Sequence, residues 1–381
     1  MHYTRGNHIT LLRNGSEYFP SLLLAIKNAK HEIFLQFYIY AIDNVGLQIG
    51  NALKQAVQRN VSVNLLIDGF GSKHLSKAYV NELEQSGIRV MFYRPKISPW
   101  SLQKNRLRRM HRKVAVIDGH IGFIGGINII DDQNTPHQTP PRIDYAVQIK
   151  GPLMHSMENN VRNLWRRVAL THLWHVVKQT HYHYNIRTEG DMDAAFVIRD
   201  NVLHRRDIEN AYLSAITNAV SEIIIANAYF VPGWRFRRAL IDAAKRGVTV
   251  KLLLQGRKEY FLMFATHAFY NEFLRQHIEL YEYRKSFMHS KVAVIDSNWA
   301  TVGSSNIDPF SLLMAHEANI IVKNRAFSQQ LKKELDTLIK EGATKITVQE
   351  WEHASIFKRM ASWIAYGMIR LFLGITGHAK E

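Results

Sequence analysis

The chain contains 381 residues, which is enough for two domains of ordinary size. With 46% apolar residues and no cysteine, the composition excludes an intrinsically disordered protein, disulfide bonds and thiolate chemistry. Lys and Arg outnumber Asp and Glu by 49 to 32, and the formal net charge of +17 favours a polyanionic partner, either nucleic acid or an anionic membrane surface, over a basic surface that serves only solubility.

The first residues lack the features of a secretory signal, because the first apolar run, residues 22–25, is short and lies too far from the N-terminus. Nowhere does the sequence reach the roughly 20 uninterrupted apolar residues that a membrane-spanning helix needs. If the protein contacts a membrane, we therefore expect it to do so from one side only.

Short runs rich in β-branched residues alternate with amphipathic windows along the chain. Helices are predicted over residues 47–59 and 234–246, and strands over residues 61–67 and 248–254. This alternation is typical of an α/β fold, and each half of the chain reads as strand, helix, strand, helix, strand and then a hairpin.

The strongest organisational feature is an internal repeat. Residues 110–118, MHRKVAVID, recur as residues 288–296, MHSKVAVID, with a difference at one position. A long repeat that occurs twice indicates two copies of one domain rather than a solenoid, which needs three or more short units. We predict a first domain over residues 1–188, a second domain over residues 189–345, and a separate C-terminal tail over residues 346–381.

In the first copy, His111 and Lys113 stand two residues apart in a predicted strand, so their side chains should share one face. Residues 119–120 lie between two apolar runs and are interpreted as a two-residue hairpin turn. Counting back from this turn places Gly126 opposite Lys113 and Asn128 opposite His111.

In the second copy, the same interpretation makes residues 297–298 the turn. It places Ser304 opposite Lys291 and Asn306 opposite His289. Both hairpins are thus predicted to bring an asparagine beside the histidine and a small residue opposite the lysine.

This set of side chains suits a phosphodiester. Lysine ammonium and asparagine amide groups, together with the Ser304 hydroxyl, can donate to phosphate oxygens and stabilise the charge that develops in the transition state. One neutral imidazole can attack phosphorus to form a phosphohistidine, and a second, protonated imidazole can give its proton to the departing alkoxide. If the two copies meet face to face, they form one site with both histidines.

Four carboxylates accompany the two motifs. Asp144 and Glu317 occupy parallel places in the two copies, where each could orient an imidazole, although a purely structural carboxylate is the alternative for either one. Asp118 and Asp296 close the two motifs and are counted among the catalytic candidates with them. Their place at the hairpin corner favours a turn-capping role over chemistry.

The two motifs resemble the signature of the phospholipase D superfamily, H-x-K-x4-D followed by G-G-x-N or G-S-x-N. They stand here as His111, Lys113, Asp118, Gly125, Gly126 and Asn128, and as His289, Lys291, Asp296, Gly303, Ser304 and Asn306. The resemblance covers roughly residues 5–345. It is greatest to the bacterial cardiolipin synthases of the B type, which lack N-terminal spanning helices.

This resemblance implies two domains related by a pseudo-twofold axis, each with a mixed β-sheet flanked by helices, and a site with no catalytic metal and no cofactor. It also implies transfer of a phosphatidyl group from one phosphatidylglycerol to the terminal hydroxyl of another, with release of glycerol. By the same resemblance His111 is the nucleophile and His289 the general acid and base. A lipid phosphodiesterase or nuclease of the superfamily is the first alternative, and a non-catalytic binding module is the second.

Three further segments bear on the partner. Residues 96–112 carry six basic residues around Trp100, which suits anionic lipid headgroups, nucleic acid phosphates or a solvated loop. Residues 356–375 are too short and too charged to span a membrane, and they fit either an interfacial helix or a helix packed on the protein. The histidines of residues 172–183 lack accompanying cysteines, and few acidic residues lie near them, so no metal site is expected there.

We therefore expect a peripheral, monotopic enzyme on the cytoplasmic face of the bacterial cell membrane. Its expected partners are an anionic phospholipid, phosphatidylglycerol, and the membrane surface, whereas nucleic acid is not expected. The oligomeric state, the donor lipid and the acyl-chain preference stay open at this point.

Overall fold

The computed structural model describes residues 1–95, 108–135, 138–171, 187–257, 261–353 and 356–375. Most of the basic segment 96–112 and all of the histidine-rich segment 172–183 lie outside the described residues.

The first half of the chain alternates strands and helices and then forms a hairpin, as predicted. Its strands are β1 (Thr4–Arg13), β2 (Glu32–Phe37), β3 (Ser62–Asp68), β4 (Arg89–Tyr93), β5 (Val114–Ile117), β6 (Ile121–Gly125), β7 (Arg142–Ile143) and β8 (Tyr145–Lys150). Its helices are α1 (Asn14–Asn28), α2 (Asn44–Gln58), α3 (Lys77–Gln85) and α4 (Met154–Thr171).

The second half repeats this order. Its strands are β9 (Met192–Arg199), β10 (Glu222–Asn227), β11 (Thr249–Gln255), β12 (Glu279–Tyr283), β13 (Phe287–Met288), β14 (Lys291–Ile295), β15 (Trp299–Gly303), β16 (Glu317–Lys323) and β17 (Ala343–Ile346). Its helices are α5 (Asp207–Thr217), α6 (Trp234–Lys245), α7 (Phe261–His267), α8 (Tyr270–Arg275), α9 (Pro309–Leu313), α10 (Arg325–Gly342), α11 (Val348–Glu352) and α12 (Ile356–Ile375).

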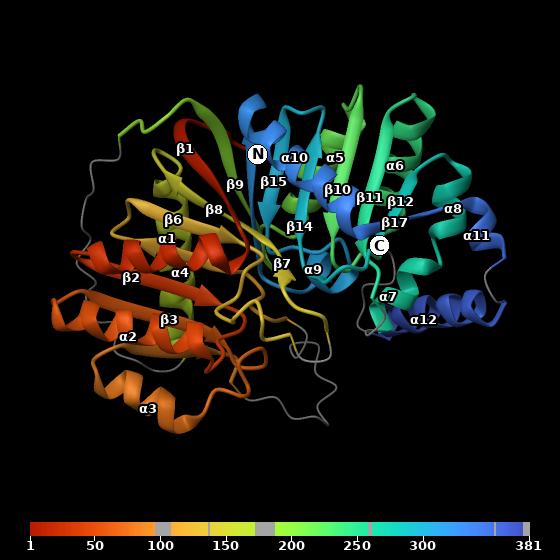
Figure 1. The fold of residues 1–381 in the computed structure, drawn as a ribbon. Helices are drawn as coiled ribbons and strands as arrows, with labels where there is room; N and C mark the ends of the chain where they lie inside the picture. The colour runs from red at the N-terminus through yellow and green to blue at the C-terminus, as the bar shows by residue number, and fades with distance from the viewer. Residues whose placement is uncertain (96–107, 136–137, 172–186, 258–260, 354–355, 376–381) are drawn as a thin grey trace.

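The two halves join into one sheet, which among the described residues has 15 strands in the order β17-β12-β11-β10-β14-β15-β16-β9-β1-β8-β6-β5-β2-β3-β4. Apart from β17, the equivalent strands of the two halves follow in the same order from the edge of the sheet to its centre, β12-β11-β10-β14-β15-β16-β9 in the second half and β4-β3-β2-β5-β6-β8-β1 in the first. In each half three strands are parallel and the hairpin runs antiparallel to them. At the centre β1 pairs antiparallel with β9, and Figure 1 shows the halves side by side. The predicted α/β fold with two pseudo-twofold-related mixed sheets is confirmed.

The halves also share a hydrophobic core. Trp165 of α4 and Leu331 of α10 belong to one buried cluster with residues of both half-sheets, whereas α1 and α2 cover the other face of the first half and α5 and α6 that of the second. All six residues of β2 are buried, because this strand lies between two others with helices on both sides. The site at the junction therefore rests on a rigid, continuous core.

The predicted hairpin register is wrong by one residue in both copies. Ile117 pairs with Ile121, and Ile295 pairs with Trp299, so each turn has three residues instead of two. The aspartate that closes each motif lies inside the turn, with φ of 51° at Asp118 and 52° at Asp296. Its carboxylate binds backbone N–H groups of a neighbouring strand, which keeps it out of the ladder.

The predicted strands around the motifs also begin later than expected. The strand β5 begins at Val114 and β14 begins at Lys291. His111, Lys113 and His289 therefore lie in the segments that lead into the hairpins. The positions of the two histidines are set by hydrogen bonds with the other half of the molecule, and not by strand alternation.

The described residues after 345 pack on the second half, where α11 contacts α8 and α12 contacts α7. The strand β17 pairs with β12 at the edge of the sheet, and Trp351 of α11 is 5% exposed. Among the described residues, no helix combines the length and the apolar character needed to cross a membrane. The predicted division into residues 1–188, 189–345 and 346–381 stays a prediction.

Candidate active site

Each catalytic candidate histidine forms a hydrogen bond with a carboxylate of the other half. The Nδ1 atom of His111 lies 2.8 Å from Oε1 of Glu317, and Nδ1 of His289 lies 2.7 Å from Oδ2 of Asp144. Both carboxylates are buried, whereas the side chains of His111 and His289 are 18% and 13% exposed. Because each half orients the histidine of the other, the four side chains form one crossed site.

Backbone pairing between the halves fixes this crossing. His111 N donates to His316 O at 3.0 Å, beside a parallel bridge between Met110 and His316. In the same way His289 N donates to Ile143 O at 2.8 Å, next to the parallel pair β13 and β7. The residue before each carboxylate therefore binds the backbone of the opposite histidine.

The last residues of β3 and β11 bind the same two segments. Asp68, the last residue of β3, accepts from Met110 N at 2.9 Å, and Gln255, the last residue of β11, accepts from Met288 N at 3.0 Å. Asp68 also binds the guanidinium of Arg109 at 2.7 Å. Sequence reasoning missed this role, although both residues stand at the same place in the matched strands.

The two motif lysines are buried against the histidines. The Nζ atoms of Lys113 and Lys291 donate to the backbone carbonyls of His111 and His289, and Lys291 Nζ lies 3.7 Å from Oδ2 of Asp144. Burial lowers the pKa of Lys113 to about 7 and that of Lys291 to about 8, although the carboxylates oppose this shift. A bound phosphate anion would supply the charge partner that favours the ammonium form.

Burial also favours the neutral form of both imidazoles. It lowers the pKa of His111, against the opposing effect of Glu317, and it lowers that of His289 to about 3, with a further contribution from Lys291. Burial alone would raise the pKa of Asp144, but Lys291 and the hydrogen bond with His289 outweigh it and the pKa is lowered. A neutral imidazole that donates from Nδ1 to a carboxylate leaves its Nε2 lone pair available for attack or proton transfer.

Ser304 has a different role from the predicted one. Its hydroxyl donates to Oε2 of Glu317 and its side chain is fully buried, so we assign it to Glu317 rather than to a substrate phosphate. The equivalent residue of the first half is Gly126, where a Cβ would overlap Oδ1 of Asp144. The small residue of each motif therefore positions a carboxylate: Ser304 binds Glu317, and Gly126 leaves space for Asp144.

The asparagines lie near the ends of the hairpins. Asn128 and Asn306 are 5% and 4% exposed. The Asn128 side-chain oxygen accepts from Ile39 N at 3.0 Å, which leaves its amide N–H groups for an anion. Their contact with phosphate stays a prediction, and the ladder pairing predicted for them does not occur, because the register differs.

Asp118 and Asp296 lie at the opposite ends of the hairpins from the histidines. The Asp118 carboxylate accepts from the N–H groups of Lys30, His31 and Glu32 at 2.8–2.9 Å. The Asp296 carboxylate accepts from the N–H groups of residues 220–222 at 2.8–3.0 Å. Both aspartates lie in the hairpin turns as expected, but each carboxylate binds the backbone at the start of β2 or β10 rather than its own turn. A catalytic role for them stays a prediction.

Two tyrosines that the sequence did not single out stand beside the histidines. The ring centroid of Tyr38 lies 4.8 Å from that of His111, and the ring of Tyr229 lies 6.4 Å from that of His289. The Nζ atom of Lys113 lies 5.3 Å from the Tyr38 ring centroid. Their matched places, one residue after β2 for Tyr38 and two residues after β10 for Tyr229, were the signal that could have identified them.

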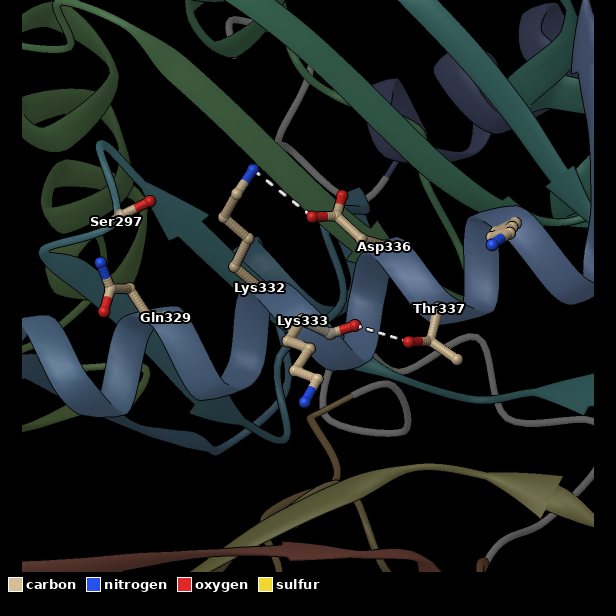
Figure 2. Close-up of a pocket in the computed structure, with 7 residues that line it drawn as sticks. Ser297, Gln329, Lys332, Lys333, Asp336 and Thr337 are labelled. Carbon is tan, nitrogen blue, oxygen red and sulfur yellow. Dashed lines mark hydrogen bonds and ion pairs between the residues drawn. The ribbon is translucent and has the colours of Figure 1, made fainter.

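A groove lined by polar side chains lies apart from the crossed site. Figure 2 shows Lys332, Lys333 and Asp336 of α10 around it, with Ser297 from the β14–β15 turn. Ser297 follows Asp296 at the end of the hairpin far from His289, so the groove does not belong to the crossed site. Within the described part of the chain, no three His, Cys, Asp or Glu side chains gather as they would around a metal ion.

Both halves of the chain match a known protein family. The family described as "Cardiolipin synthase, PLD-like domain" matches residues 22–165 and 212–339. The chain is 38% identical over 377 residues to cardiolipin synthase B of Shigella flexneri, covering 98% of this chain and 91% of that protein. It is 27% identical over 356 residues to cardiolipin synthase 1 of Bacillus cereus, covering 92% of this chain and 70% of that protein.

Solved structures support the fold. The chain is similar to phosphatidylserine synthase of Haemophilus influenzae with a TM-score of 0.66 and 11% identity, covering 97% of this chain and 94% of that one. It is similar to polyphosphate kinase of Porphyromonas gingivalis with a TM-score of 0.57 and 14% identity, covering 95% of this chain and 52% of that one. At these identities the likeness concerns the fold alone.

Proposed function

Because the chain belongs to the phospholipase D superfamily and within it to the cardiolipin synthases of the B type, we propose that it is a phosphatidyltransferase that makes cardiolipin. It moves a phosphatidyl group from one phosphatidylglycerol to the terminal hydroxyl of another and releases glycerol. The observation that carries this proposal is the crossed pairing of His111 with Glu317 and of His289 with Asp144, which brings both histidines to one site.

In the first step, Nε2 of His111 attacks the phosphorus of a bound phosphatidylglycerol. The bond from phosphorus to the glycerol oxygen breaks, and His289 gives a proton to that oxygen, so glycerol leaves. Lys113, Lys291, Asn128 and Asn306 donate to the phosphate oxygens, and the two carboxylates hold the imidazoles in position.

In the second step, His289 removes a proton from the terminal hydroxyl of the second phosphatidylglycerol. The resulting oxygen attacks phosphorus, the phosphorus–nitrogen bond breaks, and His111 is restored as a neutral imidazole. His289 must be protonated in the first step, and the anionic phosphate beside it would raise its low pKa in the complex.

The product decides between transfer and hydrolysis. Purified protein is incubated with phosphatidylglycerol vesicles, and the lipids are identified by mass spectrometry while free glycerol is measured. We expect cardiolipin and glycerol in equal amounts. Phosphatidic acid without cardiolipin would show that water is the acceptor, and nicking of single-stranded DNA without any lipid product would show a nuclease.

We further propose that the protein works as a peripheral protein on the cytoplasmic face of the bacterial membrane, where its lipid substrate lies. The formal net charge of +17 supports this, because anionic lipid surfaces attract basic proteins.

A further inference from the structure

The helix α12 has one face that packs on the protein and one apolar face that does not. On the inner face, Ala365 and Ile369 are each 3% exposed, and the ring of Tyr366 lies 4.9 Å from that of Phe269. Large apolar side chains, each more than half exposed, project outward: Phe357, Met360, Trp363, Ile364, Met368 and Leu371.

A surface helix in water packs its apolar face inward and exposes polar groups, whereas α12 carries apolar side chains on its outer face as well as on its inner face. A contiguous, exposed apolar face marks a surface that another apolar phase covers. The sequence of α12 contains Lys358, Arg359 and Arg370 but no acidic residue. Apolar side chains combined with cations only are suited to the interface of an anionic bilayer, where the cations meet the headgroups.

A second exposed tryptophan stands beside the helix. Trp234, at the start of α6, is 66% exposed. It lines a cavity of about 150 Å³ together with Ile369 and Arg370 of α12. Tryptophan is enriched at the headgroup level of membranes, so an exposed Trp234 next to α12 suits the same interface as Trp363.

The position of α12 relates this surface to the candidate active site. Gln255 at the end of β11 binds Met288 N, directly before His289, and α7 follows β11 in the chain. The helix α12 packs on α7, and Figure 1 shows the two helices along one edge of the second half. The helix α12 and His289 therefore lie at the same end of the sheet, where β11 ends.

We propose that the outer face of α12 lies in the interface of an anionic phospholipid bilayer and holds the active site against the membrane that supplies its substrate. This inference rests on the proposed function in taking a membrane lipid as the substrate. The helix lies in the plane of the membrane, with Ile364 and Met368 toward the acyl chains and Arg370 at headgroup level.

The test compares two double variants in an inactive His111→Ala background, so that turnover cannot alter the vesicles. The first variant is Ile364→Glu/Met368→Glu on the outer face of α12. The matched control is Leu24→Glu/Leu47→Glu, which changes two exposed apolar residues of α1 and α2 in the first half. Both are sedimented with vesicles of phosphatidylcholine and phosphatidylglycerol.

We expect the α12 variant to bind vesicles roughly tenfold more weakly, because two apolar side chains that enter the interface become charged, while the control binds as the parent does. The same substitutions with His111 restored should keep activity on detergent-dispersed substrate, which shows an intact fold. If they unfold the protein, Ile364→Ser/Met368→Ser replaces them.

Unchanged sedimentation of the α12 variant would overturn the proposal. A change of molar mass by light scattering with unchanged vesicle binding would overturn it too and would assign the face to contact between copies of the chain. If the His111→Ala parent binds vesicles through α12 but the active protein makes no cardiolipin, the proposed function fails and the docking surface stands.

Discussion

The two halves of the molecule differ where each supplies the carboxylate for the histidine of the other. In the second half Glu317 is held by the hydroxyl of Ser304, whereas in the first half the shorter Asp144 lies so close to Gly126 that a side chain there would overlap it. The two sequence differences are therefore one coupled difference. The glutamate needs a hydroxyl to fix its longer side chain, and the aspartate needs the space that glycine leaves.

The charges around the two histidines differ as well. Lys291 lies near Asp144, and its charge adds to burial in lowering the pKa of His289 to about 3. For His111 the carboxylate of Glu317 is the largest effect that opposes burial. Because the pKa of His289 is low, His289 can deliver a proton only if the bound phosphate raises that pKa, so its assigned role depends on the complex.

Removal of either histidine should have the largest effect on activity. We expect His111→Ala and His289→Ala each to lower kcat by roughly 10³-fold or more, because each removes one of two groups that act as a unit. Phosphatidylglycerol labelled in the phosphatidyl moiety then separates the roles. Labelled protein should accumulate with His289→Ala and not with His111→Ala.

Labelling of the His111→Ala variant alone would exchange the two roles. Turnover close to that of the unchanged protein in either variant would contradict a shared two-histidine site. Circular dichroism spectra of the two variants serve as the control for folding.

The carboxylates come next in expected effect. Asp144→Asn and Glu317→Gln should each lower kcat by roughly 10²-fold, because an amide no longer holds the imidazole in the required tautomer. We expect the larger loss for Asp144→Asn, since it also removes the charge 3.7 Å from Lys291. Steady-state kinetics of both variants check this, and a larger loss for Glu317→Gln would contradict the charge argument.

The sequence predicted the duplicated α/β fold, both motifs and the two orienting carboxylates, because these depend on local pattern and on repetition. It could not predict that Glu317 orients His111 and that Asp144 orients His289. That crossing depends on β1 and β9 meeting at the centre of one sheet, a long-range contact that no residue spacing encodes.

The hairpin register failed for a related reason. A two-residue turn was expected, but the carboxylates of Asp118 and Asp296 bind the first residues of β2 and β10, far away in the chain. These contacts place the aspartates in a left-handed turn conformation, which aspartate tolerates better than most residues. A tertiary contact thus overrode the local turn rule.

The coupling of Ser304 with Glu317 can be tested by exchange of the small residues. Ser304→Gly should lower kcat by roughly tenfold, through loss of a hydrogen bond to a charged group. Gly126→Ser should be more harmful and should also lower the free energy of unfolding by about 1–3 kcal/mol, because it overpacks the site beside Asp144. Kinetics and urea unfolding of both variants measure this, and equal behaviour of the two would contradict the coupled difference.

Substitution of either turn aspartate, Asp118 or Asp296, should have the same effect in both halves. Asp118→Ala and Asp296→Ala should each lower the free energy of unfolding by about 1–3 kcal/mol, since each leaves three backbone N–H groups without their acceptor, while kcat changes little. Burial alone would raise the pKa of Asp296, but the N–H groups of residues 220–222 and the Ser221 hydroxyl lower it.

A carboxyl with a lowered pKa in the folded state contributes stability above its unfolded pKa, near 3.9, and loses that contribution as the pH falls through the folded value. The difference in unfolding free energy between the unchanged protein and Asp296→Ala should therefore be constant near neutral pH and shrink below about pH 4. Urea unfolding across this range measures it. A loss of kcat without a loss of stability would show that Asp118 and Asp296 take part in catalysis. The two halves would then each contribute a catalytic aspartate in addition to their histidine and lysine.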